Sequence, residues 1–124
     1  MPYEISTEGT FSAAHFLDGY EGDCARLHGH NWRVRVAIRA EKNEPIGLTY
    51  DFRSLKSLIQ EVIEVLDHSV LNELPVFKGK NPTAETIAEW CYEEIASRIG
   101  DSRASVVRVE VWESLQNCAT YVKE

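Results

Sequence analysis

The sequence predicts a single α+β domain with two helices on one face of a four-stranded antiparallel sheet. Two stretches of alternating apolar and polar residues open the chain, two helical patterns follow, and two further alternating stretches close it. Strands and helices that are segregated in pairs are typical of helices packed on one face of an antiparallel sheet. We expect one domain over residues 1–124, because 124 residues with 44% hydrophobic content suit a single core.

Strands are expected wherever apolar and polar residues alternate. In the second alternating stretch, the apolar residues from Trp32 to Ile38 face one way, and Arg33, Arg35 and Arg39 face the other. The charged side is interpreted as solvated surface or, if several sheets close into a barrel, as the lining of a polar channel. The four expected strands cover residues 3–16, 28–41, 104–113 and 117–123.

Two helices are expected between the second and third strands. Asp51 can cap the first helix, whose apolar residues recur at the spacing of a helix that lies on a core. Asn81-Pro82 opens the second helix, with Pro82 in the first turn and Gly100 as a stop signal. The expected order is strand, strand, helix, helix, strand, strand, with loops at residues 17–27 and about 67–80.

The composition argues against several classes of function. Thirteen basic and 20 acidic residues give a net charge of −7, which disfavours nucleic acid or an anionic membrane as a partner. No apolar stretch has the length of a membrane span, and the N-terminus lacks the pattern of a signal peptide. Cys24, Cys91 and Cys118 form no CxxC pair and cannot all be bridged. We therefore expect a protein of the reducing cytoplasm.

Three histidines are expected to converge at one end of the sheet. His28 and His30, in the stretch CARLHGH, lie two residues apart and so point to the same, core-facing side of a strand. His15 faces the core near the end of the first strand. If the first two strands pair as a hairpin, the end of one meets the beginning of the other. Three imidazoles with an open fourth position suit a catalytic zinc ion; a hydrogen-bonded core histidine beside a polar bend is the alternative.

Further polar residues stand at the ends of predicted elements. Glu113 continues the apolar face of the third strand, where a carboxylate is costly to bury unless it binds something. Alternatively, Glu113 ends the strand rotated toward solvent. Asp67 and His68 follow Leu66, the last apolar residue of the first helical pattern, where an imidazole can also interact favourably with the end of a helix.

Six motifs occur together along the chain: FSAAH (11–15), CARLHGHNW (24–32), GLTYDF (47–52), LDHSVLN (66–72), NPTAE (81–85) and the strand that carries Glu113. This set resembles the 6-pyruvoyltetrahydropterin synthase / 6-carboxytetrahydropterin synthase family from about residue 5 to residue 121. The resemblance implies the tunnelling fold (T-fold), in which trimers of four-stranded sheets close into a barrel and two trimers often stack. A homohexamer is therefore expected.

The resemblance also implies the metal ion and the base of a zinc-dependent lyase. One zinc ion per chain would bind His15, His28 and His30, and Cys24 would remove a proton from the substrate. Zinc can stabilise a developing oxyanion as a Lewis acid. A thiol near a dication and an imidazole has its thiolate favoured, which makes Cys24 a usable base.

Further roles follow from the resemblance. Asp67 and His68 match a relay pair, which is expected to serve the zinc site of a neighbouring subunit because the family shares its active sites between subunits. Glu113 matches the residue that anchors the pterin ring, and a carboxylate can accept two hydrogen bonds from the guanidine-like edge of a pterin. Apart from the resemblance, Arg26 and Thr83 are expected among the substrate contacts, with Arg26 as a candidate contact for the triphosphate.

The short spacing between Cys24 and His28 distinguishes two branches of the family. Only three residues intervene, which resembles the bacterial 6-carboxytetrahydropterin synthases of the queuosine and other deazapurine pathways rather than the animal pyruvoyl-forming enzymes. The implied reaction converts 7,8-dihydroneopterin triphosphate to 6-carboxy-5,6,7,8-tetrahydropterin with release of acetaldehyde and triphosphate. Ser114 stands where relatives often have threonine, so the hydroxyl is kept. The pyruvoyl-forming reaction and a non-catalytic zinc- and pterin-binding domain remain alternatives.

Overall fold

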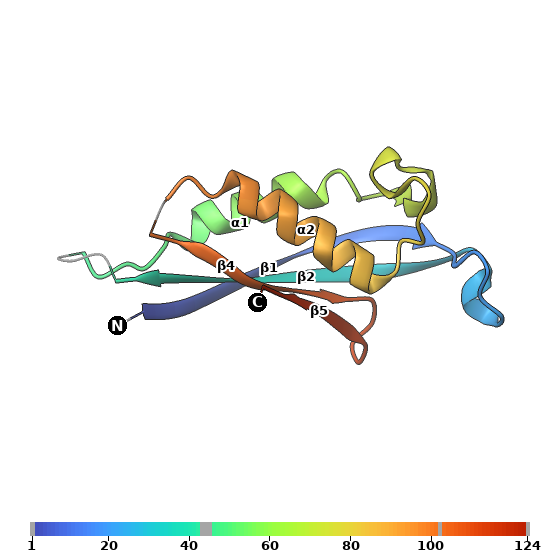
Figure 1. Ribbon diagram of the computed structural model, residues 1–124, viewed down its shortest axis with the longest axis horizontal. Helices are drawn as coiled ribbons and strands as arrows, with labels where there is room; N and C mark the ends of the chain where they lie inside the picture. Colours follow the sequence, from blue (N-terminus) through green and yellow to red (C-terminus); the bar gives the residue numbers. More distant parts are fainter. Residues whose placement is uncertain (1, 43–45, 102, 124) are drawn as a thin grey trace.

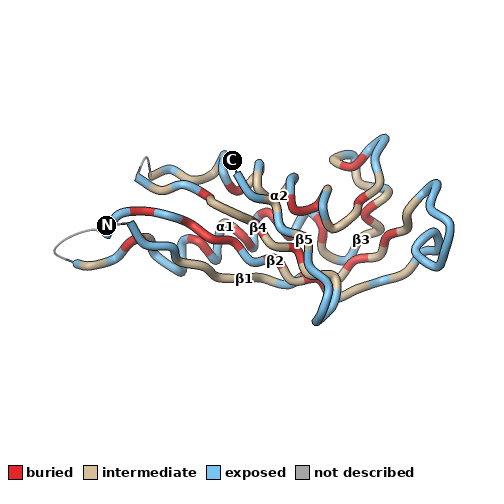
Figure 2. The backbone as a smooth tube through the Cα atoms, turned by 60° about the horizontal axis from the view of Figure 1, so that its bottom comes forward, coloured by how far each residue is buried: buried red, intermediate tan, exposed pale blue. Residues whose placement is uncertain are grey.

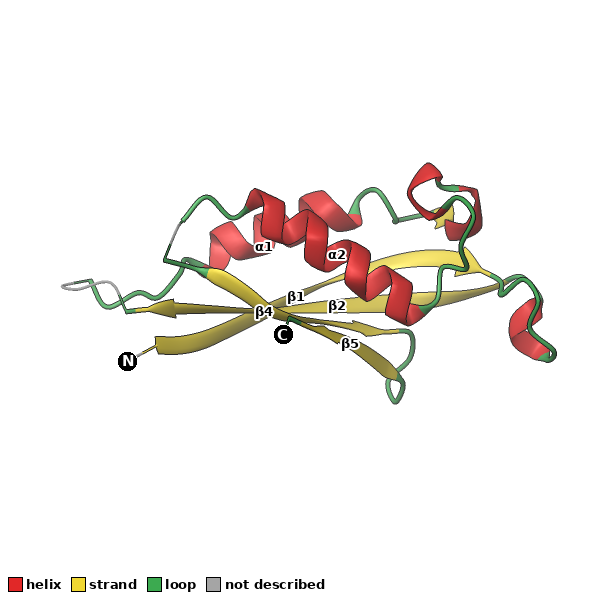
Figure 3. Cartoon of the chain, in the orientation of Figure 1, coloured by secondary structure: helices red, strands yellow, loops and turns green. Residues whose placement is uncertain are grey.

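The computed structural model describes residues 2–42, 46–101 and 103–123, and it has the predicted α+β architecture, with two helices lying on one face of a sheet (Figures 1 and 3). Among the described residues, no helix has the length and apolar character needed to cross a membrane. The strands are β1 (Pro2–His15), β2 (His28–Glu41), β3 (Ser69–Val70), β4 (Ser105–Trp112) and β5 (Cys118–Val122), and the helices are α1 (Phe52–Ile63) and α2 (Ala84–Arg98), with single 3-10 turns at Asp23–Ala25, Leu71–Glu73 and Pro75–Phe77.

The described residues form a sheet of five strands, in the order β3-β1-β2-β4-β5, rather than the four that the sequence predicts. The four predicted strands all form, and each pairs antiparallel with its neighbour. The fifth, β3, falls in the segment that was expected to be a loop, and it pairs parallel with β1 at Ala13 and Ala14. A strand of two residues is too short to produce an alternating pattern. It forms because the chain returns along the edge of β1, where the His68 N–H donates to the Ser12 carbonyl over 2.6 Å.

The two helices begin at side-chain caps. Asp51 caps α1 as predicted, since its Oδ1 accepts a hydrogen bond from the Arg53 N–H over 2.9 Å. The predicted start of α2 is wrong: Thr83 is its cap, with Oγ1 accepting from the Thr86 N–H over 3.1 Å. Pro82 therefore precedes the helix instead of occupying its first turn. A threonine hydroxyl satisfies one of the free N–H groups at a helix start, which a proline ring cannot do.

The hydrophobic core lies between the helices and the sheet. Trp32, Val34 and Val36 on β2 are fully buried there, together with the inner faces of α1 and α2. Figure 2 shows buried residues along the central strands and both helices, whereas the loop between β1 and β2 is exposed. The opposite face of the sheet carries the charged residues of β2, as their alternation predicts. The helices thus cover one face only, and the end of the β1–β2 hairpin is left open to hold a site.

Candidate metal centre and active site

The hairpin of β1 and β2 brings three histidines together at the end of the sheet. His15 pairs directly with His28, and Ala13 pairs with His30, so the three imidazoles project from neighbouring positions. One ring nitrogen from each of His15, His28 and His30 lies within 4.8 Å of the others. The ring of Trp32 packs against His15 and His30, with centroids 4.9 and 5.1 Å away, and its Nε1–H donates to the Ala13 carbonyl. The convergence predicted from the sequence is present, and the three imidazoles lie next to the ring of Trp32.

Backbone carbonyls fix how two of these imidazoles are protonated. The Nδ1–H of His15 donates to the Pro82 carbonyl over 2.8 Å, and the Nδ1–H of His28 donates to the Arg26 carbonyl over 2.7 Å. An imidazole that donates from Nδ1 keeps the lone pair on Nε2, and a hydrogen bond of this kind commonly orients a histidine that binds a metal ion. Both Nε2 atoms are therefore available as ligand atoms.

The third imidazole has a buried nitrogen without a hydrogen bond. Nε2 of His30 contacts no solvent and has no hydrogen-bond partner within the described part of the chain. Buried polar atoms of this kind are rare in native proteins, and a role as a metal ligand is one of the few explanations. Its near neighbour is Oε2 of Glu113, at 4.0 Å. The three histidines can therefore hold a metal ion, and three nitrogen ligands with an open fourth position suit zinc.

Burial favours the metal-binding form of His15 and His30. Burial lowers the pKa of His15, which the hydrogen bond to the Pro82 carbonyl partly offsets. Burial also lowers the pKa of His30, against the opposing effect of the nearby Glu113 carboxylate. Since a lowered pKa favours the neutral imidazole, both side chains have a free lone pair near neutral pH.

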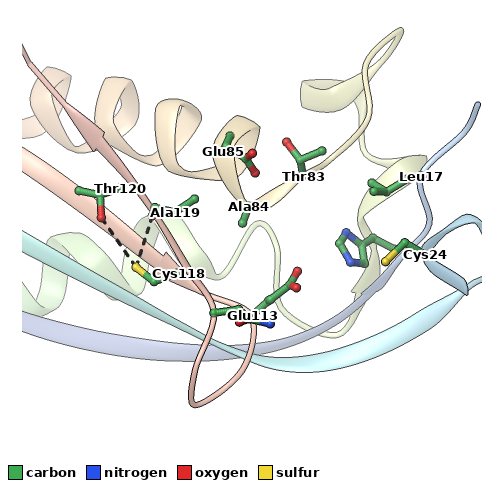
Figure 4. Close-up of a pocket in the computed structure, with 11 residues that line it drawn as sticks. Leu17, Cys24, Thr83, Ala84, Glu85, Glu113, Cys118, Ala119 and Thr120 are labelled. Atoms are coloured by element: carbon green, nitrogen blue, oxygen red, sulfur yellow. Dashed lines mark hydrogen bonds between the residues drawn. The ribbon is translucent and has the colours of Figure 1, made fainter. Parts of the chain in front are cut away.

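A cavity of about 470 Å³ lies beside the histidine cluster (Figure 4). Figure 4 shows Cys24 at one end of the cavity and Cys118 at the other, with the Glu113 carboxylate reaching in between them. The side chain of Glu113 is 31% exposed, so it is neither buried nor turned fully into solvent. The residues that line the cavity are His15, Leu17, Cys24, Thr83, Ala84, Glu85, Glu113, Asn117, Cys118, Ala119 and Thr120.

Asp67 and His68 lie outside this cavity, on the edge of β1. Nδ1 of His68 is 2.9 Å from Oδ2 of Asp67, and the His68 side chain is 82% exposed. The Ser12 N–H donates to Oδ1 of Asp67 over 2.9 Å; this hydrogen bond and the one from His68 lower the pKa of Asp67. His68 adopts a left-handed backbone conformation, with φ +57°. Within one chain, the pair is thus held in a fixed arrangement and does not line the cavity with Cys24 and Glu113, although His68 lines a separate cavity that His30 also borders.

The two expected substrate contacts are placed differently. Thr83 lines the cavity while its hydroxyl caps α2. Arg26 is exposed and contributes its carbonyl to His28, but it does not line the cavity. Sequence reasoning missed Glu85 and Cys118 in the cavity wall. Glu85 lies within the NPTAE motif and could have been considered from it, whereas Cys118 reaches the cavity only through the pairing of β5 with β4.

Comparison with known proteins agrees with this geometry. The family described as 6-pyruvoyl tetrahydropterin synthase matches residues 4–124. The chain is 33% identical to the 6-carboxy-5,6,7,8-tetrahydropterin synthase of Synechocystis sp., covering 94% of this chain and 91% of that protein. It is equally identical to the dihydroneopterin monophosphate aldolase of Pyrococcus furiosus, covering 91% of each chain.

A solved structure extends the likeness to the whole fold. The 6-pyruvoyl tetrahydropterin synthase of Caenorhabditis elegans superposes with a TM-score of 0.89 at 27% identity, covering 100% of this chain and 97% of that one. The predicted T-fold is therefore confirmed for the single chain. Sequence, fold and the histidine cluster lead to one conclusion: the chain belongs to the 6-pyruvoyl tetrahydropterin synthase family.

Proposed function

We propose that this protein is a zinc-dependent lyase that converts 7,8-dihydroneopterin triphosphate and one water molecule to 6-carboxy-5,6,7,8-tetrahydropterin, acetaldehyde and triphosphate. The observation that carries the proposal is the histidine cluster, with ring nitrogens within 4.8 Å of one another, at a cavity that also contains Cys24 and Glu113. A passive zinc site needs neither a thiol nor a carboxylate beside it, so this combination favours a reaction over a structural role.

The donor set of the site suits zinc. Three imidazoles, two of them oriented by backbone carbonyls, would leave a fourth coordination position for a substrate oxygen. Zinc bound by His15, His28 and His30 would supply a Lewis acid that stabilises negative charge on that oxygen. We propose one zinc ion per chain.

Cys24 is proposed as the base. Its thiol is exposed, lies in the short turn Asp23–Ala25 and borders the same cavity as His15. In the thiolate form, Sγ can take a proton from a substrate carbon held beside the histidine cluster. Within the loop between β1 and β2, the Leu17 N–H donates to the Cys24 carbonyl over 2.8 Å. This hydrogen bond fixes the backbone that carries the thiol.

Glu113 is proposed as the group that holds the pterin ring. Its two carboxylate oxygens can accept hydrogen bonds from the amino group and the adjacent ring N–H of a pterin, a bidentate pairing that fixes orientation as well as position. Thr83, in the same cavity wall, is proposed as a further contact. For Arg26, whose side chain does not line the cavity, a contact with substrate requires an approach from outside it.

Asp67 and His68 are proposed to act in the site of a neighbouring subunit. They are already hydrogen-bonded to each other, yet they border no part of the cavity with Cys24. The sheet has two edges that suit assembly: β5, which pairs only with β4 among the described strands, and most of β1 beyond the short β3. Proteins normally cover such edges. We propose a barrel of three sheets, with two trimers forming a homohexamer.

The compact spacing from Cys24 to His28 supports the carboxy-forming branch, as does the name of the Synechocystis relative. On this basis we propose a role in queuosine or related deazapurine biosynthesis in the cytoplasm. Incubation of the zinc-loaded protein with 7,8-dihydroneopterin triphosphate, followed by mass spectrometry, tests the reaction. The expected products are 6-carboxytetrahydropterin and acetaldehyde. A pyruvoyl product would assign the sister reaction, and a different cleaved pterin would point to the activity in the name of the Pyrococcus furiosus relative.

A further inference from the structure

A second cavity, of about 490 Å³, opens on the face of the sheet that the helices leave uncovered. Arg33, between the fully buried Trp32 and Val34, points to this face because side chains alternate along a strand. Its neighbours in the register are Thr10 on β1 and Trp112 on β4, and both line the cavity with it. Glu113 borders this cavity as well as the first one. The two cavities therefore meet at the end of β4.

Arg33 is held in place while most of its hydrogen-bonding capacity is unused. Its guanidinium carbon lies 4.6 Å from the centre of the Trp112 ring, a cation–π contact that orients the planar group. Its Nε lies 3.6 Å from Oε2 of Glu8, and this buried nitrogen makes no hydrogen bond with any described residue. By contrast, Arg35 on the same face donates from Nη2 to the Ser6 hydroxyl over 3.0 Å.

Two neighbouring side chains have donors to spare. Oδ1 of Asn31 accepts a hydrogen bond from the Ser12 hydroxyl over 2.8 Å, which directs the amide hydrogens elsewhere. Oγ of Ser114 accepts from the N–H groups of Gln116 and Asn117 over 3.3 and 3.1 Å, so its own hydrogen is free for another acceptor. A guanidinium fork with amide and hydroxyl donors around it matches an oxyanion such as a phosphate.

The first cavity has the opposite character. It is bordered by the carboxylates of Glu85 and Glu113, and no lysine or arginine of the described chain lines it. A ligand with a donor-rich ring and an anionic tail is therefore best accommodated with the donor edge of the ring at Glu113 and the tail passing His30, which also lines the second cavity, to Arg33. We infer that the second cavity binds the triphosphate group of the substrate, with Arg33 as its principal contact; this inference rests on the proposed function.

Inorganic triphosphate is the direct probe. Isothermal titration of the zinc-loaded protein should show binding that weakens at least about 10-fold in Arg33→Gln, because a charge-assisted, bidentate contact is lost. Arg35→Gln is the matched control: it removes the same charge from the same face, at a side chain that does not line the cavity. Arg35→Gln should weaken binding several-fold less than Arg33→Gln does, because it removes a nearby charge but no direct contact. Equal weakening in both variants, or no binding to the unmodified protein at millimolar triphosphate, would overturn the inference.

Zinc analysis after each titration tests whether triphosphate has removed the metal. If triphosphate binds only through zinc, Arg33→Gln will bind it as tightly as the unmodified protein does, and this outcome would contradict the inference. If Arg33→Gln does not fold, Arg33→Lys replaces it. Lysine keeps the charge but lacks the planar fork, so weakening of several-fold is expected, and unchanged affinity would overturn the inference.

Titrations with the substrate and with its phosphate-free form test whether the site binds the triphosphate group of the substrate or only free triphosphate. Arg33→Gln should weaken binding of 7,8-dihydroneopterin triphosphate but not of 7,8-dihydroneopterin, which has no phosphate. Triphosphate binding that depends on Arg33, without formation of the carboxy product, would contradict the proposed function and leave the anion site standing. Formation of the carboxy product with an unchanged KM in Arg33→Gln would contradict the anion site and leave the proposed function standing.

Discussion

His15 donates a hydrogen bond from Nδ1 to the carbonyl oxygen of Pro82 over 2.8 Å, and so joins the end of β1 to the residue that precedes the cap of α2. The two residues are 67 positions apart in the chain. The bond leaves Nε2 of His15 as the free ring nitrogen, and it places Thr83 at the same cavity. One contact thus orients a proposed metal ligand and positions a proposed substrate contact.

The histidine cluster predicts how metal content responds to substitution. About one zinc ion per chain is expected in the purified protein, and His28→Ala or His30→Ala should abolish stoichiometric zinc because each removes one of three ligands. His68→Ala serves as the control, since His68 is 82% exposed and outside the cluster. Elemental analysis after dialysis measures all three variants. Zinc retained in both cluster variants would contradict the assignment.

The sequence was sufficient to predict the cluster but not the whole cavity. His28 and His30 follow the alternation of a long strand, and the facing position of His15 follows from a simple hairpin, so local periodicity was enough. The strand β3 could not be predicted, because two residues carry no periodicity and its pairing depends on two hydrogen bonds: the Ser12 N–H donates to the Asp67 carboxylate, and the His68 N–H donates to the Ser12 carbonyl. Similarly, Cys118 enters the cavity wall through long-range pairing of β5, which leaves no local signal.

Close packing of α1 on β1 gives a prediction about stability. A Cβ on Gly9 would lie 2.9 Å from Cδ1 of Ile63 and 3.1 Å from Cγ2 of Ile59, both in the buried face of α1. Gly9→Ala should therefore lower the free energy of unfolding by about 1–3 kcal/mol, the usual effect of overpacking a core. Gly100→Ala is the control, because nothing lies within 4 Å of its Cβ position. Urea denaturation compares the two, and equal stability of both variants would show that the helix shifts without cost.

The role proposed for Glu113 predicts a selective loss of binding. In Glu113→Gln, one acceptor becomes a donor that faces the donor edge of the pterin, and loss of such a buried charged pair typically costs about 2–5 kcal/mol. Zinc should remain, because the histidine ligands are unchanged. Glu110→Gln is the control; its carboxylate accepts from the Trp112 indole and pairs with Arg108 away from the cavity. If calorimetry shows an unchanged substrate affinity in Glu113→Gln, Glu113 does not anchor the pterin and its carboxylate is simply solvated at the end of the strand.

The proposed base predicts loss of turnover without loss of metal. Cys24→Ala should keep its zinc and its substrate affinity but turn over about 100-fold more slowly or worse, the usual scale for removal of a general base. Cys118→Ala tests the thiol at the other end of the same cavity and should remain active. If Cys24 instead bound the metal, Cys24→Ala would lose zinc. A Cys24→Ala protein that works at nearly the original rate would rule out the mechanism.

Sharing of the active site between subunits can be tested by mixing two inactive variants. Cys24→Ala lacks the proposed base and His68→Ala lacks the proposed relay, so each homo-oligomer should be nearly inactive. If His68 serves the cavity of a neighbouring chain, co-expression of the two variants creates sites with an intact Cys24 from one chain and an intact His68 from the next. Random mixing of equal amounts should restore about one quarter of the normal activity, because half of the chains carry each intact residue.

The same mixing experiment distinguishes a site shared between chains from a site within one chain. If Asp67 and His68 act on the cavity of their own chain, every chain in the mixture still lacks one of the two groups and no activity returns. Light scattering of the unmodified protein should give the mass of six chains, and a monomer at micromolar concentration would exclude sharing altogether. Since Asp67 and His68 are hydrogen-bonded to each other at 2.9 Å but do not border the cavity with Cys24, restoration is the expected result.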